Sequence, residues 1–110
     1  MKHTTETRDD HMIVFLDGRL DTTQADAFEK AMTGLLDEGH TKIIFDCEKL
    51  NYISSSGLRI FLIMQKKMMG VAGKFTVCSL QPAIKEIFDM SGFTMIFNIQ
   101  PDLEAALKEE

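Results

Sequence analysis

Three consecutive hydroxyls, Ser54, Ser55 and Ser56, stand directly before Gly57 and a strongly apolar segment. Serine is a preferred residue at a helix start, because its hydroxyl accepts a hydrogen bond from a backbone N–H that the helix leaves unpaired. The same helix start offers further unpaired N–H groups and a partial positive charge, which suit an anion. The spacing leaves two uses open: a serine that caps a helix beside solvated neighbours, or a hydroxyl at Ser55 that accepts a phosphate.

A phosphoryl group on Ser55 would change the surface more than the fold. It adds about −1.5 to −2 charges at pH 7 and three acceptor oxygens. A helix start tolerates this charge, whereas a partner docked there through apolar and acidic contacts meets repulsion and a desolvation cost. The residues around Ser55 are therefore compatible with a switch that is set by phosphorylation.

Nucleophilic catalysis is the competing use of an exposed serine, and it needs a nearby base and a third group that orients the base. The histidines, His3, His11 and His40, fall at expected strand starts or in loops, and no Gly-x-Ser-x-Gly elbow surrounds Ser55. The sequence also lacks a Gly-x-Gly-x-x-Gly fingerprint, a Walker loop and a His/Cys ligand cluster. We therefore expect no catalytic residue, no metal and no cofactor, although spacing alone leaves a serine hydrolase open.

Other potentially reactive side chains have structural interpretations. Asp17, Asp21 and Asp46 fall at expected strand ends or turns, where carboxylates more often form caps and turns than acid/base pairs. Cys47 and Cys78 are too few for a disulfide framework, and each lies in an apolar run typical of a packed, reduced thiol.

The overall composition narrows the functional classes. With 110 residues, 45% of them apolar and 26% charged, the chain fits one ordinary domain over residues 1–110. The net charge of −5 argues against a nucleic-acid partner, since binding phosphates needs a basic stripe. No apolar run reaches the ~18 residues of a membrane span, and residues 1–10 lack a signal-peptide core. We expect a cytoplasmic protein without membrane insertion.

Strands and helices alternate along the chain. Apolar patterns and turn residues predict strands over 2–7, 11–16, 42–47, 74–78 and 93–99. Helical spacing and end signals predict helices from Thr23 to Gly39, over 56–69, from Pro82 to Gly92, and after Asp102. Such alternation favours right-handed crossovers and a largely parallel sheet, so we predict an α/β fold.

The helix expected after the serines carries too many apolar side chains for one core stripe. We assign Leu58, Phe61 and Leu62 to the core. Met64 and Met68 are expected on an adaptable contact surface beside the serine turn, because methionine suits surfaces that repack against partners.

Three segments, residues 18–21, 46–58 and 84–93, together resemble the STAS domain of bacterial anti-sigma factor antagonists. They occur in the right order and span nearly the whole chain. The resemblance implies a mixed sheet of about five strands with about four helices packed mainly on one side. It also implies a protein that binds a serine-kinase anti-sigma factor when unphosphorylated and thereby frees the sigma factor.

In that family the partner kinase, which holds the ATP, phosphorylates the first serine of an Asp-Ser-Ser-Gly turn, and a PP2C-type phosphatase removes the phosphate. The phosphorylated position matches Ser55. Ser54 replaces the acidic residue of the turn, and Arg59 replaces a common glycine, which places a cation where it strengthens phosphate pairing or selects a different partner. Asp21 matches an acidic position that family members hold near the switch serine.

The sequence and the resemblance together predict phosphorylation at Ser55 in a monomer or weak dimer. The predicted partner-binding residues are Asp21, Ser54, Ser56, Gly57, Leu58, Arg59, Met64 and Met68. The alternative keeps the fold without the switch, as a scaffold or accessory subunit of a transport or sensory complex.

Overall fold

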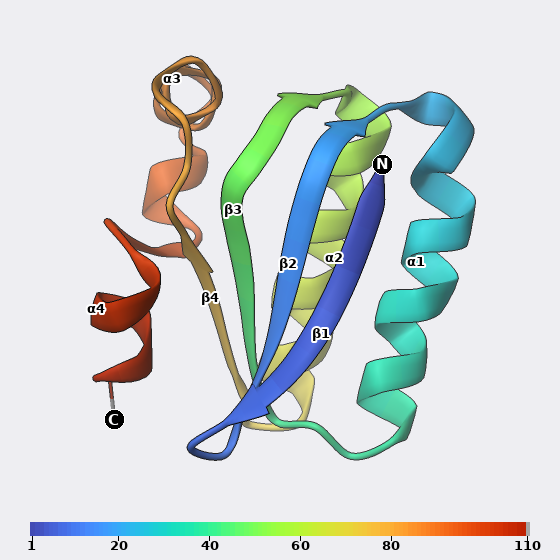
Figure 1. Cartoon of the computed structure of the whole chain (residues 1–110), viewed down its shortest axis with the longest axis vertical. Helices are drawn as coiled ribbons and strands as arrows, with labels where there is room; N and C mark the ends of the chain where they lie inside the picture. Colours follow the sequence, from blue (N-terminus) through green and yellow to red (C-terminus); the bar gives the residue numbers. More distant parts are fainter. Residues whose placement is uncertain (110) are drawn as a thin grey trace.

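A twisted sheet runs through the centre of the protein, for which the computed structural model describes residues 1–109 (Figure 1). Within these residues five strands follow one another across the sheet in the order β1-β2-β3-β4-β5. They are β1 (Lys2–Arg8), β2 (His11–Leu20), β3 (Lys42–Ile53), β4 (Lys74–Cys78) and β5 (Asn98–Gln100). The β1–β2 pair is antiparallel and the other three pairs are parallel, which confirms the predicted mixed, largely parallel sheet.

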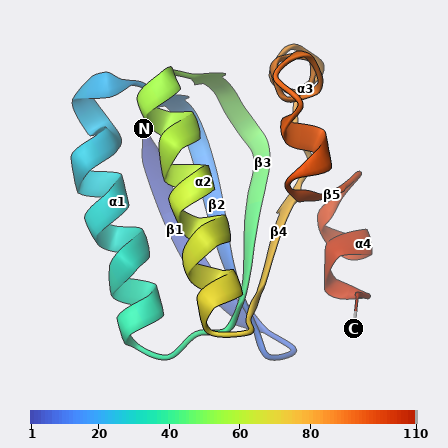
Figure 2. The same cartoon turned by 180° about the vertical axis from the view of Figure 1, so that it is seen from behind.

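The helices cover the two faces of the sheet unequally (Figure 2). The described chain forms α1 (Thr22–Asp37), α2 (Ser55–Gly70), α3 (Pro82–Met90), α4 (Leu103–Leu107) and a short 3₁₀ helix, η1 (Phe93–Met95). The main core, between the sheet and one layer of helices, contains buried residues of α1, α2 and α3. Of the helices in the described chain, only the short helix α4 packs on the opposite face, over Ile13, Ile44 and Cys78. The prediction of an α/β fold with helices mainly on one side is confirmed.

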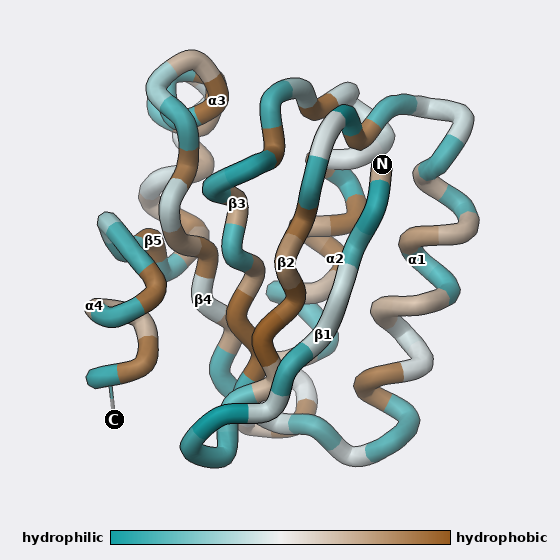
Figure 3. The backbone as a smooth tube through the Cα atoms, in the orientation of Figure 1, coloured by the Kyte–Doolittle hydropathy of each residue, from teal (hydrophilic) through white to brown (hydrophobic). Residues whose placement is uncertain are grey.

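Aromatic rings dominate the main core, where the hydrophobic centres of β2 and β3 meet α2 (Figure 3). The ring of Phe45 lies edge-on to those of Phe61 and Phe75, with centroids 5.0 and 4.8 Å apart. Such edge-to-face pairs add about 0.5–1.5 kcal/mol each to the gain from burial. Phe61, in the middle of α2, is fully buried and anchors this helix to the sheet.

Two predicted strand ends are wrong. Strand β3 continues to Ile53 and β2 to Leu20, because their parallel pairing resumes after register shifts at Phe15/Asp17 and Gly18/Arg19. The sequence pattern of period two breaks at these bulges, so the prediction ended both strands too early.

The predicted strand over residues 93–99 is wrong in its first half. Gly92 adopts a left-handed conformation (φ 76°) after α3, and a 3₁₀ helix follows it. Phe93 and Phe97, four residues apart, pack their rings 6.1 Å apart, which is a helical and not an extended spacing. Only Asn98–Gln100 pairs with β4.

Candidate functional site

The carboxyl ends of β2 and β3 meet the starts of α1 and α2 at one edge of the sheet (Figure 1). Leu20, the last residue of β2, pairs with Ile53, the last residue of β3. The backbone N–H of Ser54 then donates to the carbonyl oxygen of Leu20 over 2.9 Å. The turns that carry Asp21 and Ser54 are therefore neighbours, and we call residues Asp21 and Ser54–Arg59 the switch edge.

Ser54 is the residue that caps α2. Its backbone is extended, and its Oγ accepts a hydrogen bond from the N–H of Gly57 over 3.1 Å. Helix α2 consequently begins at Ser55, one residue earlier than predicted. Ser55 is exposed, Ser56 is half-buried, and no hydrogen bond involves the Ser55 hydroxyl within residues 1–109. The capping role and the free hydroxyl thus belong to different serines.

Asp21 is the residue that caps α1, which agrees with the cap or turn role expected for its carboxylate. Its Oδ1 accepts hydrogen bonds from the backbone N–H of Thr23 at 3.0 Å and from the Thr23 hydroxyl at 2.7 Å. The Thr23 hydroxyl, together with the Thr23 N–H and the charge of Arg19, holds the pKa of Asp21 below its ordinary value. The switch edge therefore carries a carboxylate that stays ionised.

Gly57 lies in the first turn of α2, directly on the strand ends. A Cβ atom at this position would lie 2.8 Å from Cγ1 of Ile53 and 2.9 Å from Cγ of Leu20. Gly57 is buried, and its lack of a side chain allows the helix to approach this closely. The close contact fixes the position of Ser55, two residues earlier.

Arg59 lies one helical turn after Ser55 and is exposed. Its guanidinium Nη1 is 3.6 Å from Oε1 of Glu29 on α1, a surface ion pair of small energetic weight. Arg59, Lys66 and Lys67 are the charged residues of α2, which has no acidic side chain. A cation is thus available near Ser55 at the spacing of neighbouring helical side chains.

The predicted exposure of Met64 and Met68 is wrong. Both are buried in the core, at 0% and 1% exposure, because they share the inward face of α2 with Gly57 and Phe61. Met69, at 70% exposure, is the exposed methionine of this helix. Met64 and Met68 are therefore core residues and offer no contact surface to a partner.

The three residues of α2 that were predicted to lie in the core differ in how deeply they are buried. Phe61 is fully buried, as predicted. Leu58 and Leu62 are half-buried and pack against the core from its border. Their remaining surface adds apolar area next to Ser55 and Arg59.

Two contacts at or near this edge had no clear sequence signal. The Arg19 guanidinium lies 4.1 Å from the ring centre of Tyr52, and Tyr52 is partly exposed. Nε2 of Gln81, just before α3, donates to the carbonyl oxygen of Glu48 over 2.9 Å and ties α3 to β3. Both contacts depend on the register of the strands, which the sequence does not give.

None of the three histidines forms a hydrogen bond to Ser55 in the described part of the chain. The ring of His3 packs on Phe28, Nδ1 of His11 contacts the carbonyl oxygen of Asp9, and His40 lies near a glutamate. No group of three His, Cys, Asp or Glu side chains in residues 1–109 is arranged to hold a metal ion. Among the same residues, no helix has both the length and the apolar character needed to cross a bilayer.

Asp46 lies inside β3, where a strand end or turn was predicted, and is only 5% exposed. Its Oδ1 accepts the backbone N–H of Glu48 over 3.0 Å, next to the register shift between β2 and β3. Burial raises the pKa of Asp46, against the lowering effect of this hydrogen bond. The folded chain therefore binds this proton more tightly than the unfolded chain does.

This shift predicts that Asp46→Asn stabilises the protein at neutral pH. The native carboxylate costs stability when ionised, and this cost shrinks as the pH falls through its raised pKa towards the ordinary value of 3.8. Asparagine keeps an acceptor for Glu48 without the charge. Urea unfolding should show a higher midpoint for Asp46→Asn at pH 7.5 and a smaller gain near pH 4. The exposed control Asp17→Asn should show no such gain, and an equal gain at both pH values for Asp46→Asn would contradict the assignment.

Comparison with known proteins identifies a family and a relative that match nearly the whole chain. Residues 2–106 match the STAS domain family. The chain is 35% identical over 106 residues to BtrV of Bordetella bronchiseptica, a candidate anti-sigma factor antagonist, and the match covers 96% of this chain and 91% of BtrV.

Solved structures show the same fold. A candidate anti-sigma factor antagonist of Thermotoga maritima has a TM-score of 0.93 at 20% identity, covering 96% of this chain and 92% of that one. SpoIIAA of Bacillus, solved in its phosphorylated form, has a TM-score of 0.74 at 23% identity, covering 94% and 96%. SpoIIAA in its unphosphorylated form has a TM-score of 0.75 at 20% identity, covering 94% and 92%.

Proposed function

This chain belongs to the STAS domain family, and we propose that it is an anti-sigma factor antagonist controlled by reversible phosphorylation of Ser55. The observation that carries the proposal is that two neighbouring serines, Ser54 and Ser55, have different roles. Ser54 caps α2, which leaves the exposed hydroxyl of Ser55 available at the helix start. SpoIIAA, a structural neighbour, has been solved both with and without phosphate, which supports a phosphate-dependent role for the matching fold.

In its unphosphorylated form the protein docks the switch edge against a serine-kinase anti-sigma factor, which then releases its sigma factor. The half-buried Leu58 and Leu62 supply apolar contact area beside Ser55. The kinase transfers the γ-phosphoryl group of its ATP to Oγ of Ser55, ADP leaves, and the hydroxyl proton is released. The added charge on Ser55 ends the docking. A PP2C-type phosphatase hydrolyses the phosphoserine and restores binding, and all of these partners meet in the cytoplasm.

The serine at position 54 is compatible with this switch. In the family an acidic residue precedes the phosphorylated serine, whereas here the Ser54 hydroxyl provides the cap for α2. Serine and aspartate cap helices comparably well. Replacing the carboxylate by a neutral hydroxyl also lowers the repulsion that a phosphate on Ser55 would meet.

The assignment is tested by incubating the protein with the anti-sigma kinase of its own organism and ATP. Tandem mass spectrometry of the native chain should find one phosphoryl group, on Ser55. The Ser55→Ala variant should remain unmodified, while the matched control Ser56→Ala should be modified like the native chain. A phosphate on Ser54 or Ser56, or no phosphate at all, would overturn the assignment.

Arg59 is predicted to pair with the phosphate on Ser55. Its present partner, Glu29, is 3.6 Å away at the surface and is easily exchanged for a doubly charged group. The pairing favours the dianion, so Arg59→Gln should raise the second pKa of phosphoserine, ordinarily about 6. Titration of the phosphorylated proteins by ³¹P NMR measures this shift, with Arg59→Lys expected between the two. Superimposable titration curves for native protein and Arg59→Gln would show that no pairing occurs.

A scaffold without a switch is the second candidate, and one observation favours it. Met90 and Met95, at 81% and 89% exposure, lie on α3 and η1 outside the switch edge and offer an apolar contact surface that Ser55 does not control. In that case the native chain and Ser55→Ala would bind the same partner equally, whether or not the native chain has been treated with phosphatase.

A further inference from the structure

The face of the sheet opposite α1 and α2 is only partly covered. Helix α4 packs over Ile13, Ile44 and Cys78. Beyond this cluster, β1, β2 and β3 border a pocket of about 300 Å³. This volume is at the lower end of the range typical of small-molecule sites.

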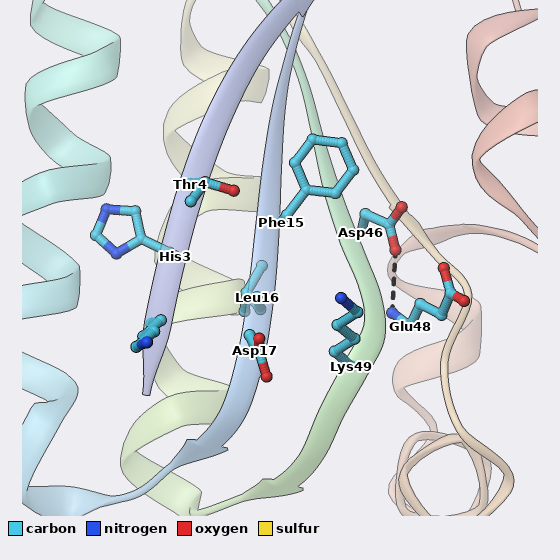
Figure 4. A pocket seen from close by; sticks show the side chains of 9 residues that line it. His3, Thr4, Phe15, Leu16, Asp17, Asp46, Glu48 and Lys49 are labelled. Atoms are coloured by element: carbon cyan, nitrogen blue, oxygen red, sulfur yellow. Dashed lines mark hydrogen bonds between the residues drawn. The ribbon is translucent and has the colours of Figure 1, made fainter.

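Side chains of different chemistry meet in this pocket (Figure 4). Phe15 and Asp46 are register partners on β2 and β3, and Thr4 of β1 pairs with Phe15 on the other side. Asp17 pairs with Lys2 on β1 and with Lys49 on β3. The pocket therefore has an aromatic and acidic floor and two lysines at its rim.

Asp46 is the unusual member of the floor. It is only 5% exposed, and its two neighbours in the chain, Phe45 and Cys47, are fully buried and apolar. Its Oδ1 accepts the N–H of Glu48, and no hydrogen bond to Oδ2 occurs within residues 1–109. Among the described residues, the one fully buried side-chain nitrogen or oxygen without a partner is Oε1 of Gln24, so Oδ2 of Asp46 is reached by solvent. It can therefore accept a hydrogen bond from a molecule in the pocket.

The rim is also available for binding. Lys2 and Lys49 form no ion pair within 4.0 Å among the described residues, although Asp17 lies between them in the register. These two ammonium groups outnumber the single carboxylate of Asp17 beside them, so this part of the rim attracts a carboxylate or a phosphate.

From this arrangement we propose that the open face of the sheet binds a small zwitterionic molecule with a flat apolar body. Its ammonium group hydrogen-bonds to Oδ2 of Asp46, its body lies on the ring of Phe15, and its acidic group pairs with the ammonium groups of Lys2 and Lys49. Oδ2 of Asp46 has no partner within residues 1–109, Phe15 is half-buried, and both lysines are exposed, so each of the three contacts is open to a ligand. The site is independent of the switch edge and of its proposed phosphorylation.

Three matched probes test the proposal on the whole chain of residues 1–110 by ¹H–¹⁵N NMR titration. 4-(Aminomethyl)benzoate carries both charged groups on a rigid ring, benzylamine carries the ammonium alone, and 4-methylbenzoate carries the carboxylate alone. The zwitterion should shift the amides of Phe15, Asp46 and Lys49 in a saturable way. It should bind about tenfold more tightly than either single-charge probe.

Variants assign the two ends of the probe. In Asp46→Asn, which keeps an acceptor for Glu48, the zwitterion should bind no more tightly than 4-methylbenzoate. In Lys49→Gln, a change at an exposed position, it should bind no more tightly than benzylamine. Ser55→Ala should bind the zwitterion like the native chain. The proposal is wrong if no probe gives saturable shifts at these amides, or if the zwitterion binds Asp46→Asn as tightly as the native protein.

Discussion

The Ser55→Asp variant should bind the anti-sigma partner at least about 100-fold more weakly than the native chain, a loss of about 2.7 kcal/mol. Its thermal unfolding midpoint should stay within about 2 °C of the native value. Ser55 is exposed and opens α2, where a negative charge is favoured by the unpaired N–H groups of the helix start. The same charge meets the partner at close range, where like charges cost several kcal/mol.

The control for this variant is Thr41→Asp, which adds the same charge at the opposite edge of the sheet, just before β3. Thr41 is exposed, so this change should alter neither stability nor binding. Isothermal titration calorimetry gives the affinities and circular dichroism the unfolding midpoints. Loss of cooperative unfolding in Ser55→Asp would mean that the serine is structural, and native-like affinity would mean that charge at Ser55 does not control docking.

Gly57→Ala should lower the free energy of unfolding by about 1–3 kcal/mol, the usual cost of overpacking. The added methyl group would lie under 3.0 Å from side-chain atoms of Leu20 and Ile53, so α2 or the strand ends must move. Because this contact positions Ser55, binding of the partner should weaken as well.

Gly34→Ala is the matched control for this change. Gly34 also lies in a helix, but a Cβ atom there would meet nothing within 4 Å. This variant should gain about 0.4–1 kcal/mol, because alanine restricts the unfolded chain more than glycine does. Urea unfolding measures both changes, and equal stability of Gly57→Ala and Gly34→Ala would show that the start of α2 is not tightly packed.

Local patterns were sufficient to predict most of the fold. The apolar run at Lys74–Cys78 and the helix that Pro82 opens lie where the sequence places them, because turn residues at both ends mark their limits. The serine run likewise predicted a helix start with a capping hydroxyl. The sequence could not say which serine caps, since that depends on how β3 delivers the chain to α2.

The errors have a common physical origin in tertiary contacts. Helix α2 carries more apolar side chains than one inward stripe needs, so its composition does not reveal which of them face the sheet. The buried position of Gly57 sets that side and takes Met64 and Met68 inward with it. The bulge beside Asp46 likewise depends on the pairing of β2 with β3, which short-range periodicity does not encode.

Calorimetry on one protein sample in three successive states tests whether a phosphate on Ser55 controls docking. The purified chain is titrated into the anti-sigma kinase before phosphorylation, after phosphorylation at Ser55, and after phosphatase treatment. We predict tight binding, then at least about 100-fold weaker binding, then full recovery, with native circular dichroism in every state. Equal affinity in the first two states would contradict control by Ser55.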